Sequence, residues 1–148
     1  MVGEFISEIK WEATALCHAK NITLTTEIRN LPEVFYGDTV LLVSALSNIL
    51  ANAIEYSPPN GNVTISISGR EDMLTFTFTD SGKGFSFASL KNATQQFYTE
   101  DEERSGKHYG MGLFIAESVA KKHGGKLIIA NNVEDCGAVV TLIVKDTH

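Results

Sequence analysis

Two asparagines inside one apolar segment are the first residues of this sequence that could do chemistry. Asn48 and Asn52 stand four residues apart in SNILANAIEYSPPNG (47–61), and Glu55 follows three residues later, with Tyr56 beside it. Helix positions i, i+4 and i+7 share one face. An amide oxygen can ligate Mg²⁺ without repelling nearby phosphates, and Mg²⁺ prefers oxygen ligands while it bridges phosphates. Asparagine also caps or hydrogen-bonds locally, so both a metal site and a structural role remain open.

A carboxylate followed by glycines forms the second candidate. In TDSGKGF (79–85), Asp80 closes an alternating apolar segment, and Gly82 and Gly84 follow it. A carboxylate held at the end of a strand can accept a hydrogen bond from an exocyclic amine such as that of adenine. Glycines let the backbone approach a ligand, although Asp-Ser-Gly is also ordinary turn chemistry. The segment is not a P-loop, because Thr77 and Gly84 replace required residues of that motif.

A third cluster of glycines precedes a helical pattern. Gly106, Gly110 and Gly112 lead into the apolar repeat that begins at Leu113. Backbone N–H groups at a helix N-terminus attract phosphate oxygens. The spacing is not a dinucleotide-binding fingerprint, because that motif would place glycine where Ile115 stands. A flexible entry into the helix is the simpler alternative.

The residues around these motifs predict the elements that position them. Helical periodicity predicts helices over 4–20, 38–57 and 112–123. Alternating apolar residues predict strands over 22–28, 63–68, 74–80, 126–130 and 138–145, with a short edge strand or turn at 31–37. Asp38 suits the N-cap of the second helix, and two prolines after Ser57 should end it. Between 81 and 110 the periodicity disappears, and a loop this long is usually functional.

The composition fits one folded domain of 148 residues. Hydrophobic residues make up 43% and charged residues 20%, which supports a core. The net charge of -6 argues against a nucleic-acid binder. Cys17 and Cys136 are far apart and read as free thiols, and the histidines have no metal-ligand spacing. No apolar run approaches the roughly 20 residues of a membrane-spanning helix, so we expect a soluble, cytosolic chain. The order of the predicted helices and strands indicates an α/β two-layer sandwich, with a mixed sheet covered on one face by helices.

In their order and spacing, the motifs resemble the catalytic ATP-binding domain of sensor histidine kinases, which belongs to the GHKL superfamily with type II topoisomerases, Hsp90 and MutL. The resemblance covers about residues 20–145. YGDTVLLVSALSNILANAIEYS resembles the N box, DSGKGF the first glycine box, QFYTEDEERSG the F box and GMGLFIAESVAKKHGG the second glycine box. It implies a Bergerat fold over a single domain, 1–148, with an N-terminal helix (1–20) and a flexible ATP lid (83–110).

The resemblance also implies roles for residues. Asn52 and Asn48 would hold Mg²⁺ at the phosphates, and Asp80 would bind the adenine amine. Further nucleotide contacts are implied for Tyr56, Gly82, Gly84, Phe97, Arg104, Lys107, Gly110, Met111, Gly112, Leu113 and Thr141. Topoisomerase-like relatives carry a water-activating Glu at the position of Asn48. An amide cannot take a proton, so Asn48 favours phosphoryl transfer to histidine over hydrolysis, since transfer depends mostly on positioning and charge neutralisation.

Two departures from the family pattern stand out. The family often has Lys or Arg where Glu55 stands, so nucleotide binding should be weaker unless Glu55 turns away or Arg104 and Lys107 compensate. No acceptor box of the H-E-x-x-R kind is present. We expect His18 on the surface and His123 as a cation at a helix C-terminus.

We therefore expect the ATP-binding catalytic domain of a two-component sensor histidine kinase. It would transfer the γ-phosphate to a His on a separate dimerisation domain and act indirectly on a response regulator. The full-length protein would be a membrane-anchored homodimer with this domain in the cytoplasm, and the domain by itself could be a monomer. The alternatives are a stand-alone Ser kinase resembling anti-sigma factors and a non-catalytic ATP-gated signalling module.

Overall fold

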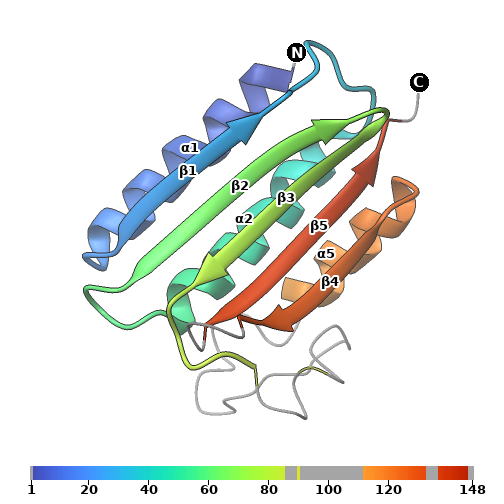
Figure 1. Cartoon of the computed structure of the whole chain (residues 1–148). Helices are drawn as coiled ribbons and strands as arrows, with labels where there is room; N and C mark the ends of the chain where they lie inside the picture. Colours follow the sequence, from blue (N-terminus) through green and yellow to red (C-terminus); the bar gives the residue numbers. More distant parts are fainter. Residues whose placement is uncertain (1, 86–89, 91–111, 133–136, 147–148) are drawn as a thin grey trace.

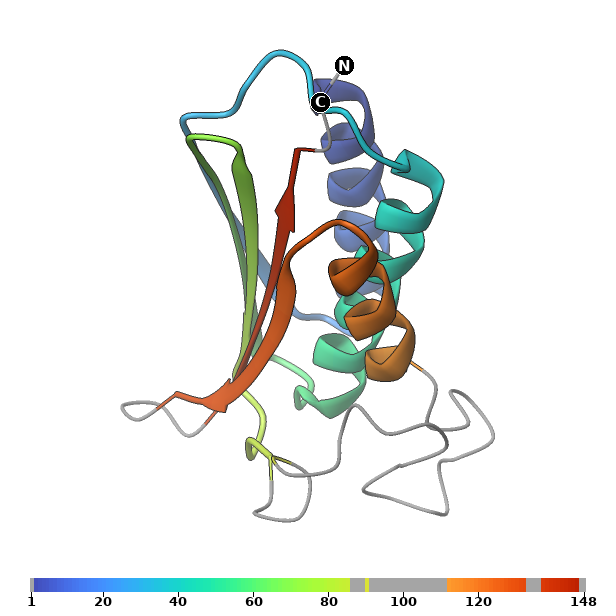
Figure 2. The same ribbon diagram turned by 90° about the vertical axis from the view of Figure 1, so that its right-hand side faces the viewer.

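The helices and the sheet form two layers. The computed structural model describes residues 2–85, 90, 112–132 and 137–146 (Figure 1). In this part of the chain the helices are α1 (Val2–Ala19), α2 (Thr39–Tyr56) and α5 (Gly112–Lys122). The strands are β1 (Thr23–Arg29), β2 (Asn62–Arg70), β3 (Met73–Asp80), β4 (Lys126–Asn131) and β5 (Ala138–Lys145). The three helices lie on one face of the sheet (Figure 2), which confirms the predicted two-layer sandwich.

The sheet is mixed, as predicted, and β3 lies at its centre. The strand order is β1-β2-β3-β5-β4. β1 pairs with β2 in parallel, and the other neighbours are antiparallel. Residues 31–37 form no strand in the described structure, so the turn alternative is correct there, and β1 and β4 are the two edge strands of the sheet. The central strand therefore delivers its last residue, Asp80, between β2 and β5.

Alternating side chains bury one face of the sheet against the helices. The inward residues of β3 are Leu74, Phe76 and Phe78, each 1% exposed. They face the apolar stripe of α2, which includes Leu42, Leu46, Ile49 and Leu50. Contrary to the expectation that no apolar run approaches membrane-spanning length, α2 could cross a membrane by length and composition, but here it is the central helix of this core. In α1, Val2 and Ile6 are buried, whereas Leu16 is exposed although it is apolar.

Both ends of α2 are fixed by hydrogen bonds. Asp38 is the N-cap, and its carboxylate accepts from the Leu41 N–H at 3.1 Å, as the sequence predicted. At the other end, the Ser57 N–H donates to the carbonyls of Ala53 and Ile54. The chain then turns away at Pro58, because the residue before a proline leaves the helical region. Residues at the two ends of α2 therefore determine where the helix begins and ends.

His123 is not the helix-end cation that we expected. Its side chain is 3% exposed at the end of α5. Nε2 accepts a hydrogen bond from the Asp38 N–H at 3.0 Å, and Nδ1 lies 2.9 Å from the Val119 carbonyl oxygen. A neutral ring with its proton on Nδ1 satisfies both contacts. The expectation was wrong because the long-range bond to Asp38 joins the end of α5 to the start of α2, which local sequence does not reveal.

The structure also describes His18 and Cys17, for which the sequence predicted a surface position and a free thiol. His18 is exposed, as expected. Cys17 is a buried free thiol, and burial raises its pKa. Cys136 lies outside the described residues.

Replacing His123 by Ala should destabilise the domain by about 2–4 kcal/mol, because it leaves a cavity and removes the acceptor of the Asp38 N–H. Urea unfolding followed by circular dichroism measures this. His18→Ala is the matched control and should change stability by less than about 0.5 kcal/mol. If both substitutions changed the free energy of unfolding equally, the buried contacts of His123 would contribute nothing to stability.

Candidate functional site

The two asparagines lie on an open face of α2. Asn48 and Asn52 are half-buried, whereas Ile49, Leu50 and Ala53 between and beside them face the core. In the described structure neither side-chain amide forms a hydrogen bond, although the bonds of other side chains are found along the same helix. The local capping role therefore has no support. Two amides one turn apart remain available to a ligand.

The start of α5 lies beside this face. A Cβ on Gly112, the first residue of α5, would stand 3.8 Å from the Asn48 Cβ. The free backbone N–H groups of a helix N-terminus favour anions. Leu113, the next residue, is 6% exposed and packs in the core, so only its backbone could contribute to a site here. Amides that can ligate a cation and a helix end that attracts anions are thus neighbours.

Asp80 is a buried carboxylate on the helix-facing side of the sheet. Its side chain is 6% exposed and follows the inward register of Phe76 and Phe78. Oδ1 accepts from the Gly82 N–H at 2.9 Å and from the Ala138 N–H at 3.1 Å. Burial raises the pKa of Asp80, and the two backbone hydrogen bonds oppose that shift. Because both bonds go to Oδ1, Oδ2 is left as the acceptor for a further donor.

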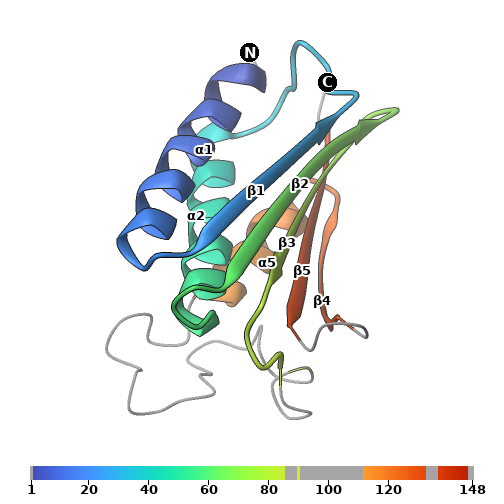
Figure 3. The same ribbon diagram turned by 60° about the vertical axis from the view of Figure 1, so that its left-hand side comes forward.

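The turn after Asp80 rests directly on the C-terminal end of α2. A Cβ on Gly82 would overlap the Tyr56 backbone oxygen, so only glycine fits. Gly84 has φ of 81°, a conformation that favours glycine. Figure 3 shows the ends of α2 and β3 and the start of α5 at the same end of the molecule. Asp80, Gly82, Tyr56 and the two asparagines therefore come together from segments far apart in sequence.

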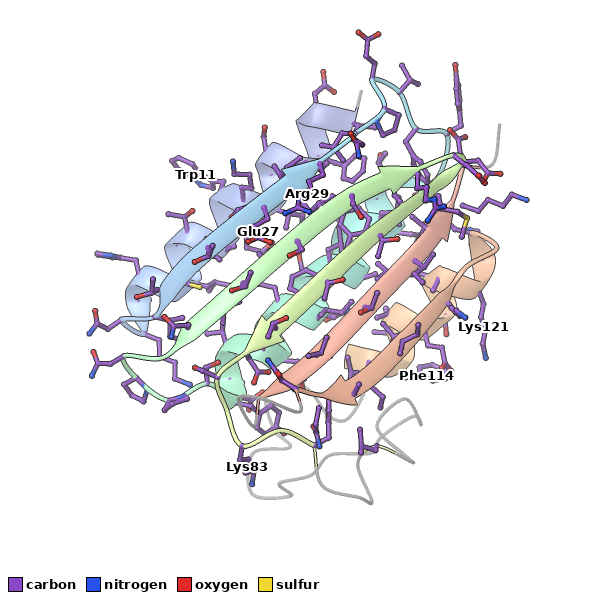
Figure 4. The ribbon with its side chains drawn as sticks, viewed as in Figure 1. Trp11, Glu27, Arg29, Lys83, Phe114 and Lys121 are labelled. Carbon is purple, nitrogen blue, oxygen red and sulfur yellow. The ribbon has the colours of Figure 1, made fainter. Side chains whose placement is uncertain are left out.

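The remaining predicted site residues fall into two groups. Thr141 lies between Val140 and Leu142, which face the helices, so its side chain is on the opposite face of the sheet from Asp80. The structure thus removes Thr141 from the site. Phe97, Arg104, Lys107, Gly110 and Met111 lie outside the described residues, as does most of the predicted lid at 83–110. Of that segment, Lys83 is seen projecting from the turn after β3 (Figure 4).

Two supporting residues were missed by sequence reasoning. Lys20 Nζ donates to the carbonyl oxygens of Ile54 at 2.7 Å and Glu55 at 2.9 Å, and so caps the last turn of α2. Gly137, read only as part of a turn, packs where a Cβ would overlap the Asp80 backbone oxygen. Neither contact could be predicted from the local sequence, because each joins segments more than 30 residues apart.

Replacing Gly82 by Ala should destabilise the domain by roughly 1–3 kcal/mol, because the added methyl group forces the turn off the end of α2. Thermal unfolding of the purified chain measures the loss. Gly3→Ala is the matched control, since nothing lies within 4 Å of the position that its Cβ would take. That substitution should be neutral or stabilising in a helix. If Gly82→Ala were as stable as Gly3→Ala, the close packing of the turn on Tyr56 would be wrong.

Comparison with known proteins agrees with this geometry. Residues 37–148 match the family described as histidine kinase-, DNA gyrase B- and HSP90-like ATPase. The chain is 36% identical to sensor histidine kinase SpaK of Bacillus subtilis over 133 residues, 89% of this chain and 29% of SpaK. It is 46% identical to the nisin biosynthesis sensor protein NisK of Lactococcus lactis subsp. lactis over 112 residues, 75% of this chain and 25% of NisK.

The solved structures agree on the fold. Full-length ShkA in complex with AMPPNP aligns with a TM-score of 0.80 at 17% identity, over 97% of this chain and 30% of that one. The chain spans less than a third of the length of these two curated relatives. Since the family match covers most of the chain, and includes Asn48, Asn52, Asp80 and the start of α5, the chain belongs to the histidine kinase-, DNA gyrase B- and HSP90-like ATPase family.

Proposed function

We propose that this chain is the ATP-binding catalytic domain of a sensor histidine kinase. The observation that carries the proposal is the meeting of three features at one end of the sandwich. These are the open amides of Asn48 and Asn52, the start of α5 next to them, and the buried Asp80 on its glycine turn. Relatives that are named sensor kinases support the proposal.

The residues present fit ATP with Mg²⁺. Oδ2 of Asp80 can accept from the exocyclic amine of adenine, and Gly82 leaves the backbone of the turn uncovered beside it. The described residues hold no cluster of three His, Cys, Asp or Glu side chains that could bind a metal alone. A cation near Asn48 and Asn52 would therefore need phosphate and water oxygens as additional ligands, which is the usual environment of Mg²⁺.

The chemistry of the side chains indicates transfer rather than hydrolysis. Bound Mg²⁺ would neutralise phosphate charge. Asn48 and Asn52 have no proton-accepting group and would orient the phosphates, while the first backbone N–H groups of α5 would stabilise negative charge. A neutral imidazole is already a nucleophile and needs little help from a base, so an acceptor His suits a site without a catalytic carboxylate beside the phosphates.

The partners follow from this proposal. The acceptor His would lie on a dimerisation domain outside this chain, and a response regulator would receive the phosphate later. In the full-length protein, a membrane-anchored homodimer would carry this domain in the cytoplasm. Glu55 is half-buried on the same face as the asparagines, so its negative charge would oppose the phosphates.

A trans-phosphorylation assay tests the function. The chain is mixed with Mg²⁺, radiolabelled ATP and a separate His-containing dimerisation domain of a close relative. We expect label on the dimerisation domain that is lost in acid and stable in base. Label that survives acid, on serine, would support the Ser kinase alternative, and nucleotide binding without any transfer would support the non-catalytic module.

Replacing Asn52 by Ala should weaken Mg²⁺-dependent AMPPNP binding by at least roughly 10- to 100-fold, the loss that removing even an outer-shell partner of a metal site causes. Isothermal titration calorimetry measures affinity with Mg²⁺ and again with EDTA. Because the role of Asn52 acts through the cation, the difference from wild type should largely vanish in EDTA. Ser44→Ala, at an exposed position on α2, is the control. An equal loss with and without Mg²⁺ would rule out the metal role.

Replacing Asp80 by Asn should abolish most adenine nucleotide binding while leaving the empty domain at least as stable as wild type at pH 7. Asn keeps the acceptor for the two N–H groups but presents no second carboxylate oxygen. Burial raises the pKa of Asp80, so the folded chain binds this proton more tightly than the unfolded chain. Its stabilising contribution is full below the unfolded pKa and is lost as pH rises through the folded pKa.

The stability advantage of Asp80→Asn should therefore shrink as the pH falls through the raised pKa of the folded Asp80 towards the ordinary pKa of an unfolded aspartate, about 4. Urea unfolding between pH 4 and 7, together with calorimetric ADP titration, checks both parts. A variant that is clearly less stable at pH 7, or that binds ADP normally, would contradict the assignment.

A further inference from the structure

Ser57 carries a buried hydroxyl without a partner. Its side chain is 2% exposed, and in the part of the chain that the structure describes its Oγ is the buried side-chain polar atom that lacks a hydrogen bond. A buried polar atom left unpaired costs about 1–3 kcal/mol. Alanine would remove that cost at this position, so the presence of serine needs an explanation.

The residues on both sides of Ser57 are connected to the turn that follows Asp80, Tyr56 directly and Pro58 through Gly61. The Tyr56 backbone oxygen lies against Gly82, as described above. Gly61 packs between the Pro58 carbonyl oxygen and the Ser81 hydroxyl, and that hydroxyl accepts from the Asn62 N–H at 2.8 Å. Ser57 therefore lies in the corner between the end of α2 and the turn at 80–82.

Asp80 and Ser57 offer complementary groups in this corner. Asp80 uses Oδ1 for the N–H groups of Gly82 and Ala138, which leaves Oδ2. The described structure forms no hydrogen bond between Asp80 and Ser57. An ionised carboxylate oxygen only accepts, whereas a serine hydroxyl can donate. A ligand or a water molecule that satisfies both must present a donor next to an acceptor.

We propose that Ser57 is a specificity-determining residue at the base end of the site and that it reads a 6-aminopurine together with Asp80. The polar edge of a 6-aminopurine places an amine donor beside a ring-nitrogen acceptor. Asp80 Oδ2 accepts from the amine, and the Ser57 hydroxyl donates to the ring nitrogen, directly or through one water. A 6-oxopurine presents the reverse pattern and meets the carboxylate with an oxygen. The inference rests on the proposed nucleotide-binding function.

Two substitutions test the hydroxyl. Ser57→Ala removes it, and Ser57→Cys nearly keeps its volume with a much weaker donor. Both should weaken ADP binding roughly three- to tenfold in Mg²⁺, the effect of one net hydrogen bond. The melting temperature of the nucleotide-free chain should stay the same or rise in Ser57→Ala, because an unpaired buried hydroxyl is removed. This opposite sign of the two effects separates a ligand contact from a structural one.

The matched control is Ser47→Ala on the same helix. The Ser47 hydroxyl donates to Glu12 Oε2 at 2.7 Å, so its hydrogen bond is internal. This variant should bind ADP as wild type does and should melt at the same temperature or lower.

A chemical test identifies the atom that Ser57 reads. The diphosphate of 1-deazaadenosine has C–H in place of the ring nitrogen next to the amine, and the 6-amino group is kept. It should bind wild type more weakly than ADP does, and Ser57→Ala should weaken it no further. The two changes would then remove the same interaction.

The outcomes separate this inference from the proposed function. If wild type binds ADP and both Ser57 variants bind it equally well, the inference is overturned while the proposed function stands. The same holds if Ser57→Ala lowers the melting temperature with unchanged ADP affinity, because the hydroxyl then has a structural role. If the Ser57→Ala effect persists in full with the 1-deaza analogue, the assigned ring nitrogen is wrong. Absence of ADP binding by wild type would overturn the proposed function and this inference together.

Discussion

The contact of the turn at 80–82 with the end of α2 organises the site. Gly82 packs on the Tyr56 backbone oxygen, and its N–H holds Asp80 Oδ1. Lys20 fixes the same end of α2 from the other side, through the carbonyls of Ile54 and Glu55. A carboxylate on the central strand and two amides on the central helix are thereby held in one rigid arrangement. Any shift of this contact would move Asp80 relative to Asn48 and Asn52, the residues that we propose for the base and the phosphates.

The site keeps polar groups that the fold itself does not use. Asp80 is a buried carboxylate whose pKa is raised by desolvation, and Ser57, at the end of α2 on which the turn after Asp80 packs, holds an unpaired hydroxyl. Asn48 and Asn52 occupy helix positions where Ala or Leu would favour the helix more. The core around them, from Phe76 on β3 to Leu50 on α2, is apolar and closely buried. Stability is thus concentrated in the core, and the polar groups at one end are available to a ligand.

Much of the fold could be predicted from local sequence patterns, whereas the long-range contacts that support the site could not. Apolar periodicity and the caps placed every described helix and strand to within two residues, because α2 and β3 show the repeats of their geometry strongly. Asp80 and the two asparagines were identifiable because their spacing in the chain matches a family. Lys20, Gly137 and the Asp38–His123 bond join distant segments and leave no local pattern. Thr141 was misplaced because the two-residue alternation of β5 was not aligned with Asp80 across the sheet.

The most direct measurement uses nuclear magnetic resonance of the labelled chain with ADP and Mn²⁺ in place of Mg²⁺. The unpaired electrons of Mn²⁺ broaden the signals of nearby groups. The side-chain amides of Asn48 and Asn52 and the backbone of Gly112 should broaden most, while Gly82 should shift with ADP even when no metal is added. Sharp signals from both asparagines, with the broadening centred on carboxylates elsewhere such as Glu4 and Glu8, would contradict the account.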